Sequence, residues 1–146
     1  MALAHAMWVH GHSMQIENPE RLASVWRAGM YVRVEGKPGN ATWFHFAIPT
    51  PVIVNDHRLR AWRVMLQFRT SSADAFVRDI HVYDGESKIA QFNGVNLSGN
   101  VGWRAFDIPG NPEVRLGIGI SIGVGFGVEG MSHQMEFISA GCDFIP

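Results

Sequence analysis

The stretch from Val114 to Val128 constrains the fold more than any other part of the chain. Its even-numbered positions are all apolar, and the odd-numbered positions between Leu116 and Val128 are glycine, with Ser121 as the only exception. Such alternation is typical of a strand with one buried face. A straight strand of this length would span roughly 50 Å, too far for a domain of this size. We therefore expect it to curve, bulge or break at its glycines.

Three functional sequence patterns overlap within this strand. Residues 119–123 read G-x-S-x-G, residues 125–130 read G-x-G-x-x-G, and glycines four apart read G-x-x-x-G. A nucleophile elbow requires a sharp turn between a strand and a helix, and a dinucleotide fingerprint requires a helix to follow. The apolar stretch is also shorter than the ~18 residues of a membrane helix. We interpret all three patterns as chance matches that arise because glycines alternate along one strand.

The rest of the chain repeats the two-residue period in short runs. Alternating runs occur near residues 30–35, 43–48 and 62–69, and turn sequences rich in Gly, Pro, Asn and Asp separate them. Evenly spaced short strands indicate a sandwich or a barrel. We predict an all-β fold, an antiparallel β-sandwich of jelly-roll type with about eight strands, and a closed β-barrel is the alternative.

One short helix is expected near residue 20. Asn18 is a suitable N-cap and Pro19 a suitable first helical residue. Leu22, Val25 and Trp26 would then share one face. Gly29 would end the helix after one to two turns.

Length and composition narrow the class of protein. The 146 residues predict a single domain over 1–146, and charged residues make up 17%, against roughly 25% in ordinary chains. A surface so poor in charge predicts a homo-oligomer. The net charge of −1 argues against nucleic acid as a partner. Cys142 is the only cysteine, and neither a signal peptide nor a membrane helix is evident, so we expect a cytoplasmic protein.

Four stretches together resemble a set of small bacterial β-proteins of unknown function. They are WVHGHSMQIENPE (8–20), WFHFAIPTPVIV (43–54), HVYDG (81–85) and SAGCDF (139–144). The likeness extends over most of the chain. It implies a single bacterial-type domain and supplies no activity or site.

A first candidate site is the sequence HGH near the N-terminus. His10 and His12 would point to one face of a strand, and Glu17 follows, which is similar to the first metal motif of the cupins. The cupin motif has glycines at the positions of Ala4 and Ser24, and a second cupin motif is not evident. Two histidines at a strand end, without a metal, are the alternative interpretation.

A second candidate depends on strand parity, which places aromatic and imidazole side chains on one face of each strand. If the strands are neighbours, one surface would contain His81, the carboxylate of Asp79 and six expected ligand contacts: Trp8, His10, His12, Trp43, His45 and Tyr83. Such a lining suits a sugar or another flat amphipathic ligand. An oligomer interface has a similar composition.

We therefore expect a non-catalytic module that binds a small ligand, such as a carbohydrate, and that self-associates. One alternative is a small enzyme, either cupin-like with a transition metal or a metal-free isomerase, lyase or cyclase. In the metal-free enzyme, His81 would act as the base and Asp79 would orient it. Another alternative is a purely structural, self-assembling protein. Apart from the metal-dependent alternative, we expect no cofactor.

Overall fold

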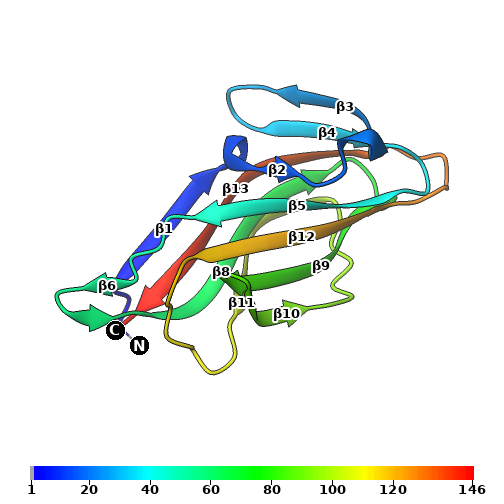
Figure 1. Ribbon diagram of the computed structural model, residues 1–146. Coiled ribbons are helices and arrows are strands. Elements are labelled where there is room, and N and C mark those ends of the chain that lie inside the picture. The colour runs from blue at the N-terminus through cyan, green and yellow to red at the C-terminus, as the bar shows by residue number, and fades with distance from the viewer. Residues whose placement is uncertain (1) are drawn as a thin grey trace.

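Two antiparallel sheets lie face to face in the computed structural model, which describes residues 2–146 (Figure 1). The strands of the first sheet are β1 (His5–His10), β3 (Leu22–Arg27), β4 (Val32–Gly36), β8 (Arg60–Thr70), β11 (Asn100–Asp107) and β13 (Gln134–Ile145). They are arranged in the order β11–β8–β13–β4–β3, and β1 pairs with β13 beyond the end of β4. The long strand β13 therefore organises this sheet.

The second sheet has five strands. They are β2 (Gln15–Ile16), β5 (Ala41–Ile48), β9 (Ala75–Asp84), β10 (Ser87–Phe92) and β12 (Ile118–Phe126). Their order is β10–β9–β12–β5–β2, so the glycine-rich strand β12 is central. A separate hairpin consists of β6 (Ile53–Val54) and β7 (His57–Arg58). The sheets stay separate, which confirms the sandwich of jelly-roll type over the closed alternative.

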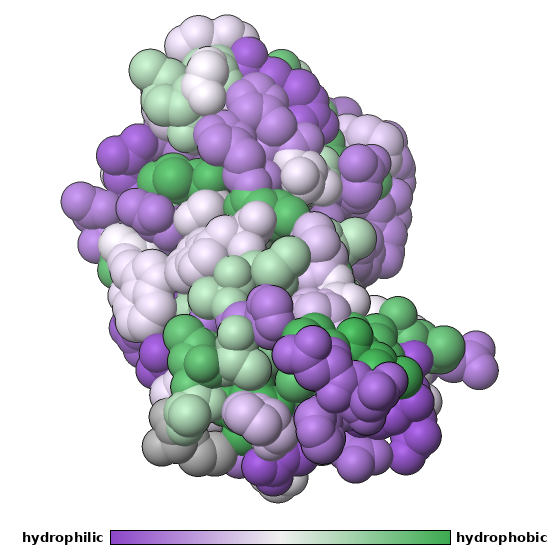
Figure 2. Space-filling view, turned by 90° about the vertical axis from the view of Figure 1, so that its left-hand side faces the viewer, coloured by the Kyte–Doolittle hydropathy of each residue, from purple (hydrophilic) through white to green (hydrophobic). Residues whose placement is uncertain are grey.

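The core fills the space between the sheets. Its largest fully buried side chains include Phe44, Phe46, Phe68, Phe137 and Phe144. Alternating strand residues point inward, so each strand places its other side chains on an outer face. Hydrophilic residues with separate hydrophobic areas between them cover the side of the molecule in Figure 2.

The glycine-rich strand is shorter than its sequence pattern. Even-numbered residues of β12 are buried as predicted, but Leu116 and Val128 are each 73% exposed beyond its ends. The strand begins where the Asp84 carboxylate accepts backbone N–H groups from residues 115, 116 and 117. Its pairing with β9 also shifts register between Gly123 and Val124. The regular strand is therefore confined to part of the alternating stretch, and it has an irregularity at one of its glycines, as expected.

The helix near residue 20 is a single 3₁₀ turn, Pro19–Arg21 (η2). Asn18 and Pro19 occupy its start as expected, but the predicted continuation toward Gly29 is wrong because Leu22–Arg27 is strand β3. Pairing with β4 buries Leu22 in the core and leaves Trp26 exposed. β-Branched and aromatic side chains favour this extended conformation.

Two further features bear on function. Cys142 is fully buried, and this burial, with the nearby Asp143 charge, raises the pKa of its thiol to about 12, which makes the thiol inert. Across residues 2–146, no helix is long and apolar enough to cross a membrane.

Candidate functional site

The outer face of the second sheet carries a groove whose floor is strand β12. The outward-facing positions of this strand include Gly119, Ser121 and Gly123, which have little or no side chain. Four larger side chains stand beside them on the neighbouring strands: Trp43 and His45 on β5, and His81 and Tyr83 on β9. Cross-strand neighbours share a face of the sheet, so these side chains form the two walls.

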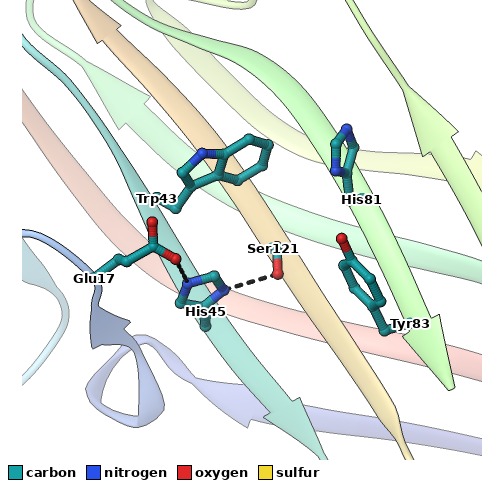
Figure 3. Close-up of a pocket in the computed structure, with 6 residues that line it drawn as sticks. All are labelled: Glu17, Trp43, His45, His81, Tyr83 and Ser121. Carbon is teal, nitrogen blue, oxygen red and sulfur yellow. Dashed lines mark hydrogen bonds and ion pairs between the residues drawn. The ribbon is translucent and has the colours of Figure 1, made fainter. Parts of the chain in front are cut away.

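The register fixes each wall residue opposite one floor position. Ser121 lies between His45 and His81, whereas Gly119 is opposite Tyr83. A Cβ atom added to Gly119 would find no atom within 4 Å, so the floor is open there. The resulting pocket has a volume of about 330 Å³ and is lined by Glu17, Trp43, His45, His81, Tyr83 and Ser121 (Figure 3).

The indole of Trp43 lies flat on Gly123. A Cβ atom added to Gly123 would be 3.1, 3.2 and 3.3 Å from three consecutive atoms of the indole benzene ring. Nearly equal distances to consecutive ring atoms mean that the ring presents its face, not its edge, to the glycine. The opposite face of the half-buried ring is turned away from the sheet. Only a glycine leaves room for this arrangement on β12.

A hydrogen-bonded chain of three residues borders the pocket. The Ser121 Oγ lies 2.8 Å from the His45 Nδ1, and the His45 Nε2 lies 2.8 Å from the Glu17 Oε1. The carboxylate only accepts hydrogen bonds, so Nε2 of His45 carries a hydrogen. In the neutral ring, Nδ1 then accepts the hydrogen bond that the Ser121 hydroxyl donates. Glu17 thus fixes the tautomer of His45 and the direction of the Ser121 hydroxyl.

The opposite wall is arranged differently. The His81 ring lies 4.9 Å from the Trp43 ring, and its Nε2 is 2.9 Å from the Asn93 Oδ1. Asp79 instead accepts hydrogen bonds from the Gly94 N–H and the Arg78 Nε. The predicted pairing of His81 with Asp79 is therefore not formed, because the loop after β10 supplies the partner of each.

Trp8, His10 and His12 do not reach this groove. Strand β1 pairs with β13 in the first sheet, which places Trp8 on the opposite outer face of the sandwich. There the Trp8 ring packs near Trp103, at 6.3 Å between ring centroids. The expectation that the six aromatic and imidazole residues share one surface is correct for Trp43, His45 and Tyr83 and wrong for the other three.

The residues of the cupin-like motif do not converge either. His10 ends β1, whereas His12 belongs to the 3₁₀ turn Gly11–Ser13 (η1) that carries the chain from the first sheet to the second. The two imidazoles stack at 4.7 Å, and Glu17 is paired with His45 instead. Within residues 2–146, no three His, Cys, Asp or Glu side chains are grouped to hold a metal ion.

Sequence reasoning missed Ser121 and Glu17 as members of the groove. The sequence did contain a signal for Ser121, because it is the one outward-facing residue of β12 whose side chain can form a hydrogen bond. Ser121 lies within a regular strand, as expected, and not on a nucleophile elbow. Glu17 offered no such signal, because its contact with His45 joins residues 28 positions apart.

Comparison with known proteins places the chain in a family. The match extends over residues 3–146. The chain belongs to the family of unknown function DUF6623. This confirms the resemblance to an uncharacterised set of small proteins. No curated protein sequence matches the chain.

Solved structures resemble this DUF6623 member in fold. A low-affinity xylan-binding module, CBM86, from Roseburia intestinalis has a TM-score of 0.60 at 10% identity, with 97% of each chain covered. A cyclase from Fischerella sp. TAU has a TM-score of 0.56 at 9% identity, covering 95% of this chain and 88% of its own. The same kind of cyclase in complex with 4-(1H-indol-3-yl)butan-2-one has a TM-score of 0.54 at 8% identity, covering 96% and 89%. At these identities the likeness shows the fold alone.

Proposed function

We propose that the groove on the outer face of the second sheet binds a carbohydrate and that the protein is a non-catalytic binding module. The observation that carries this proposal is the Trp43 indole, which lies flat on Gly123 with its other face turned outward. The apolar C–H face of a sugar ring stacks on such a surface. The ring is held by the sheet beneath it, so little conformational entropy is lost when a ligand binds.

The polar groups around the indole suit sugar hydroxyls. Glu17 offers carboxylate acceptors, the Ser121 oxygen can accept a further hydrogen bond, and Nδ1 of His81 is a further polar group that no hydrogen bond within residues 2–146 occupies. The chain through His45 holds Glu17 and Ser121 in fixed positions. A ligand site combines an apolar surface with a few oriented polar groups in this way.

The fold likeness supports the same ligand class. The module CBM86 that this chain resembles is named for binding xylan, and its chain is covered over 97% of its length. We therefore take xylo-oligosaccharides as the first probes.

Isothermal titration with xylo-oligosaccharides, preceded by a glycan array to widen the search, tests the proposal. Trp43→Ala should weaken binding about tenfold or more, as the loss of a central aromatic contact does. The matched control is Trp103→Ala, because Trp103 is an exposed tryptophan on β11 of the other sheet. Equal affinities in Trp43→Ala and the wild type would contradict this function.

A small metal-free enzyme, such as a cyclase, is the second candidate. The chain Ser121–His45–Glu17 favours it, because a histidine with a fixed tautomer beside a carboxylate is a suitable general base. In this alternative, Nδ1 of His45 takes the hydroxyl proton of Ser121 as the Ser121 oxygen takes a proton from the substrate, and Glu17 stabilises the imidazolium that forms. This role replaces that of His81 with Asp79.

Incubation with 4-(1H-indol-3-yl)butan-2-one, the ligand of a similar cyclase, distinguishes the two candidates. An enzyme would convert it or a related indole to a product seen by mass spectrometry, and His45→Ala would abolish conversion. Binding of sugars without any conversion would favour the binding module.

We also propose that the protein self-associates through β3. This strand is at the end of the first sheet, and five of its six residues are exposed. Val25 and Trp26 are exposed on it, and Met30 follows in the connecting turn. Tryptophan and methionine are enriched in interfaces. Because two antiparallel copies of an edge strand can pair about a twofold axis, the partner we propose is a second copy of this chain.

A further inference from the structure

We propose that the groove is an extended site that takes several consecutive units of a linear, neutral polysaccharide rather than one sugar. This inference rests on the proposed carbohydrate-binding function and adds a second platform along β12. The second platform is Phe76, one of the residues that line a second pocket of about 330 Å³.

Phe76 repeats the arrangement of Trp43 one step along the same strand. Its ring covers Gly125, because a Cβ atom added there would lie 2.7 Å from the Phe76 Cζ. Gly123 and Gly125 point to the same side of β12, two residues apart. At ~3.3 Å per residue, the two glycines beneath the platforms are roughly 7 Å apart along β12.

The loop between β10 and β11 adds polar groups beside Phe76. Leu97 and Val77 exchange two backbone hydrogen bonds of 2.9 Å, so this segment extends the sheet next to β9. Leu97 packs against the core, and its neighbours Asn96 and Ser98 line the pocket with Phe76. An amide and a hydroxyl thus lie at the second platform, as the imidazoles do at the first.

In the proposed extended site, the outward-facing residues of β12 link the two pockets into one path. The path begins at Tyr83, opposite Gly119, passes Trp43 and ends at Phe76, opposite Gly125. Gly119 and Gly125, at the two ends of the path, are six positions apart on β12, so the path is roughly 20 Å long. A single sugar would occupy only one platform, whereas a chain of several units can contact all three aromatic side chains.

The charges along the path favour a neutral chain. Between the platforms, the Arg78 Nε lies 3.2 Å from the Asp79 carboxylate, so these two charges compensate each other. At the other end, Glu17 is a carboxylate with a histidine partner. With no cation left unpaired among these groups, the groove would repel a polymer of acidic sugars rather than attract it. Neutral xylan is the polysaccharide class that we infer.

The length dependence of binding tests this inference. Affinities for xylobiose through xylohexaose are measured by isothermal titration for the wild type, Phe76→Ala and Trp43→Ala, with Trp103→Ala as the control. We expect the wild-type affinity to rise about fivefold or more with chain length, because the longer ligands reach the second platform. Phe76→Ala should remove this rise and leave xylobiose binding unchanged.

The outcomes separate the two proposals. An affinity that is independent of length, or a Phe76→Ala variant that keeps the whole rise, overturns the extended site and leaves the carbohydrate module intact. If no xylo-oligosaccharide or other glycan binds the wild type, both proposals fail. A preference for polyanionic oligosaccharides would overturn the inference of a neutral ligand.

Two further variants keep the test decisive if Phe76→Ala unfolds. Phe76→Leu retains apolar volume over Gly125 but lacks a flat ring. Ser98→Ala removes a polar group from the exposed loop beside the second platform. Each should flatten the length dependence without lowering the melting temperature, and full wild-type behaviour in both overturns the extended site.

Discussion

Ser121 and His45 face each other across neighbouring strands, with the Ser121 Oγ 2.8 Å from the His45 Nδ1. The contact joins the floor of the groove to one wall. Because Glu17 holds the other ring nitrogen of His45, the three side chains are oriented as a unit. A ligand that enters the groove therefore meets polar groups whose positions are already fixed, which lowers the entropy cost of binding.

Replacing Ser121 by alanine should weaken ligand binding without unfolding the protein. The variant loses one hydrogen bond, worth about 1 kcal/mol, and leaves His45 without one of its two partners. We expect an affinity for xylo-oligosaccharides about fivefold lower by titration calorimetry. Ser139→Ala is the matched control, since its hydroxyl bonds Gln67 on the other sheet. Equal losses in both variants would contradict a role for Ser121 in the groove.

Gly123→Ala should displace the Trp43 ring. The added Cβ would lie 3.1 Å from the nearest indole atom, which is closer than ordinary van der Waals contact, so the ring must lift from the sheet. We expect a shifted tryptophan emission spectrum and an affinity at least about tenfold lower. Gly119→Ala is the control for the emission shift, because its Cβ would meet no atom within 4 Å. An unchanged emission spectrum in Gly123→Ala would show that Trp43 does not rest on this glycine.

These glycines also show what the sequence pattern could predict. The alternation along β12 correctly identifies a strand with one buried face and a nearly flat outer face. It does not show what covers that outer face: Trp43 covers Gly123 and Phe76 covers Gly125, both from adjacent strands, whereas Gly119 is open. Parity shows which face a side chain occupies but not which strands are neighbours.

The same limit explains the N-terminal residues. Trp8 has the parity expected for an outer face, but β1 pairs with β13, so the face belongs to the other sheet. The turn η1 then transfers the chain to the second sheet, which separates His10 from Glu17 although they are only seven residues apart. Which sheet a strand joins depends on contacts between residues far apart in sequence, and a local sequence pattern does not reveal these contacts.

Asp84 should stabilise the start of β12 in a pH-dependent manner. Although desolvation raises its pKa, hydrogen bonds from the backbone N–H groups of Gly117, Leu116 and Arg115 lower it below the usual value. A carboxyl group with a depressed pKa in the folded state contributes stability above its unfolded pKa of about 3.9. This contribution is lost as the pH falls through the folded-state pKa.

We therefore expect Asp84→Asn to lower the free energy of unfolding by about 1–3 kcal/mol at pH 7. The difference from the wild type should shrink as the pH falls below about 4. Urea unfolding at several pH values measures this, with Asp107→Asn, an exposed carboxylate on β11, as the control. A difference that stays constant down to the lowest pH would show that the charge of Asp84 is not responsible.

Trp26→Glu should prevent self-association through β3. The Trp26 side chain is 53% exposed on a strand that pairs only with β4 among residues 2–146. In a dimer formed by antiparallel pairing of β3, a glutamate at this position would be buried beside its symmetry mate. Burial of two like charges opposes association, so the dissociation constant should rise about a hundredfold.

Light scattering over a range of concentrations measures this effect. We expect a wild-type dimer at micromolar concentration and a Trp26→Glu monomer with an unchanged melting temperature. Trp103→Glu is the control, because Trp103 is similarly exposed on β11 at the opposite end of the sheet. If Trp103→Glu were monomeric and Trp26→Glu remained dimeric, the interface would lie on β11 and not on β3. A monomeric wild type at high micromolar concentration would contradict self-association itself, because the exposed edge of β3 would then remain free.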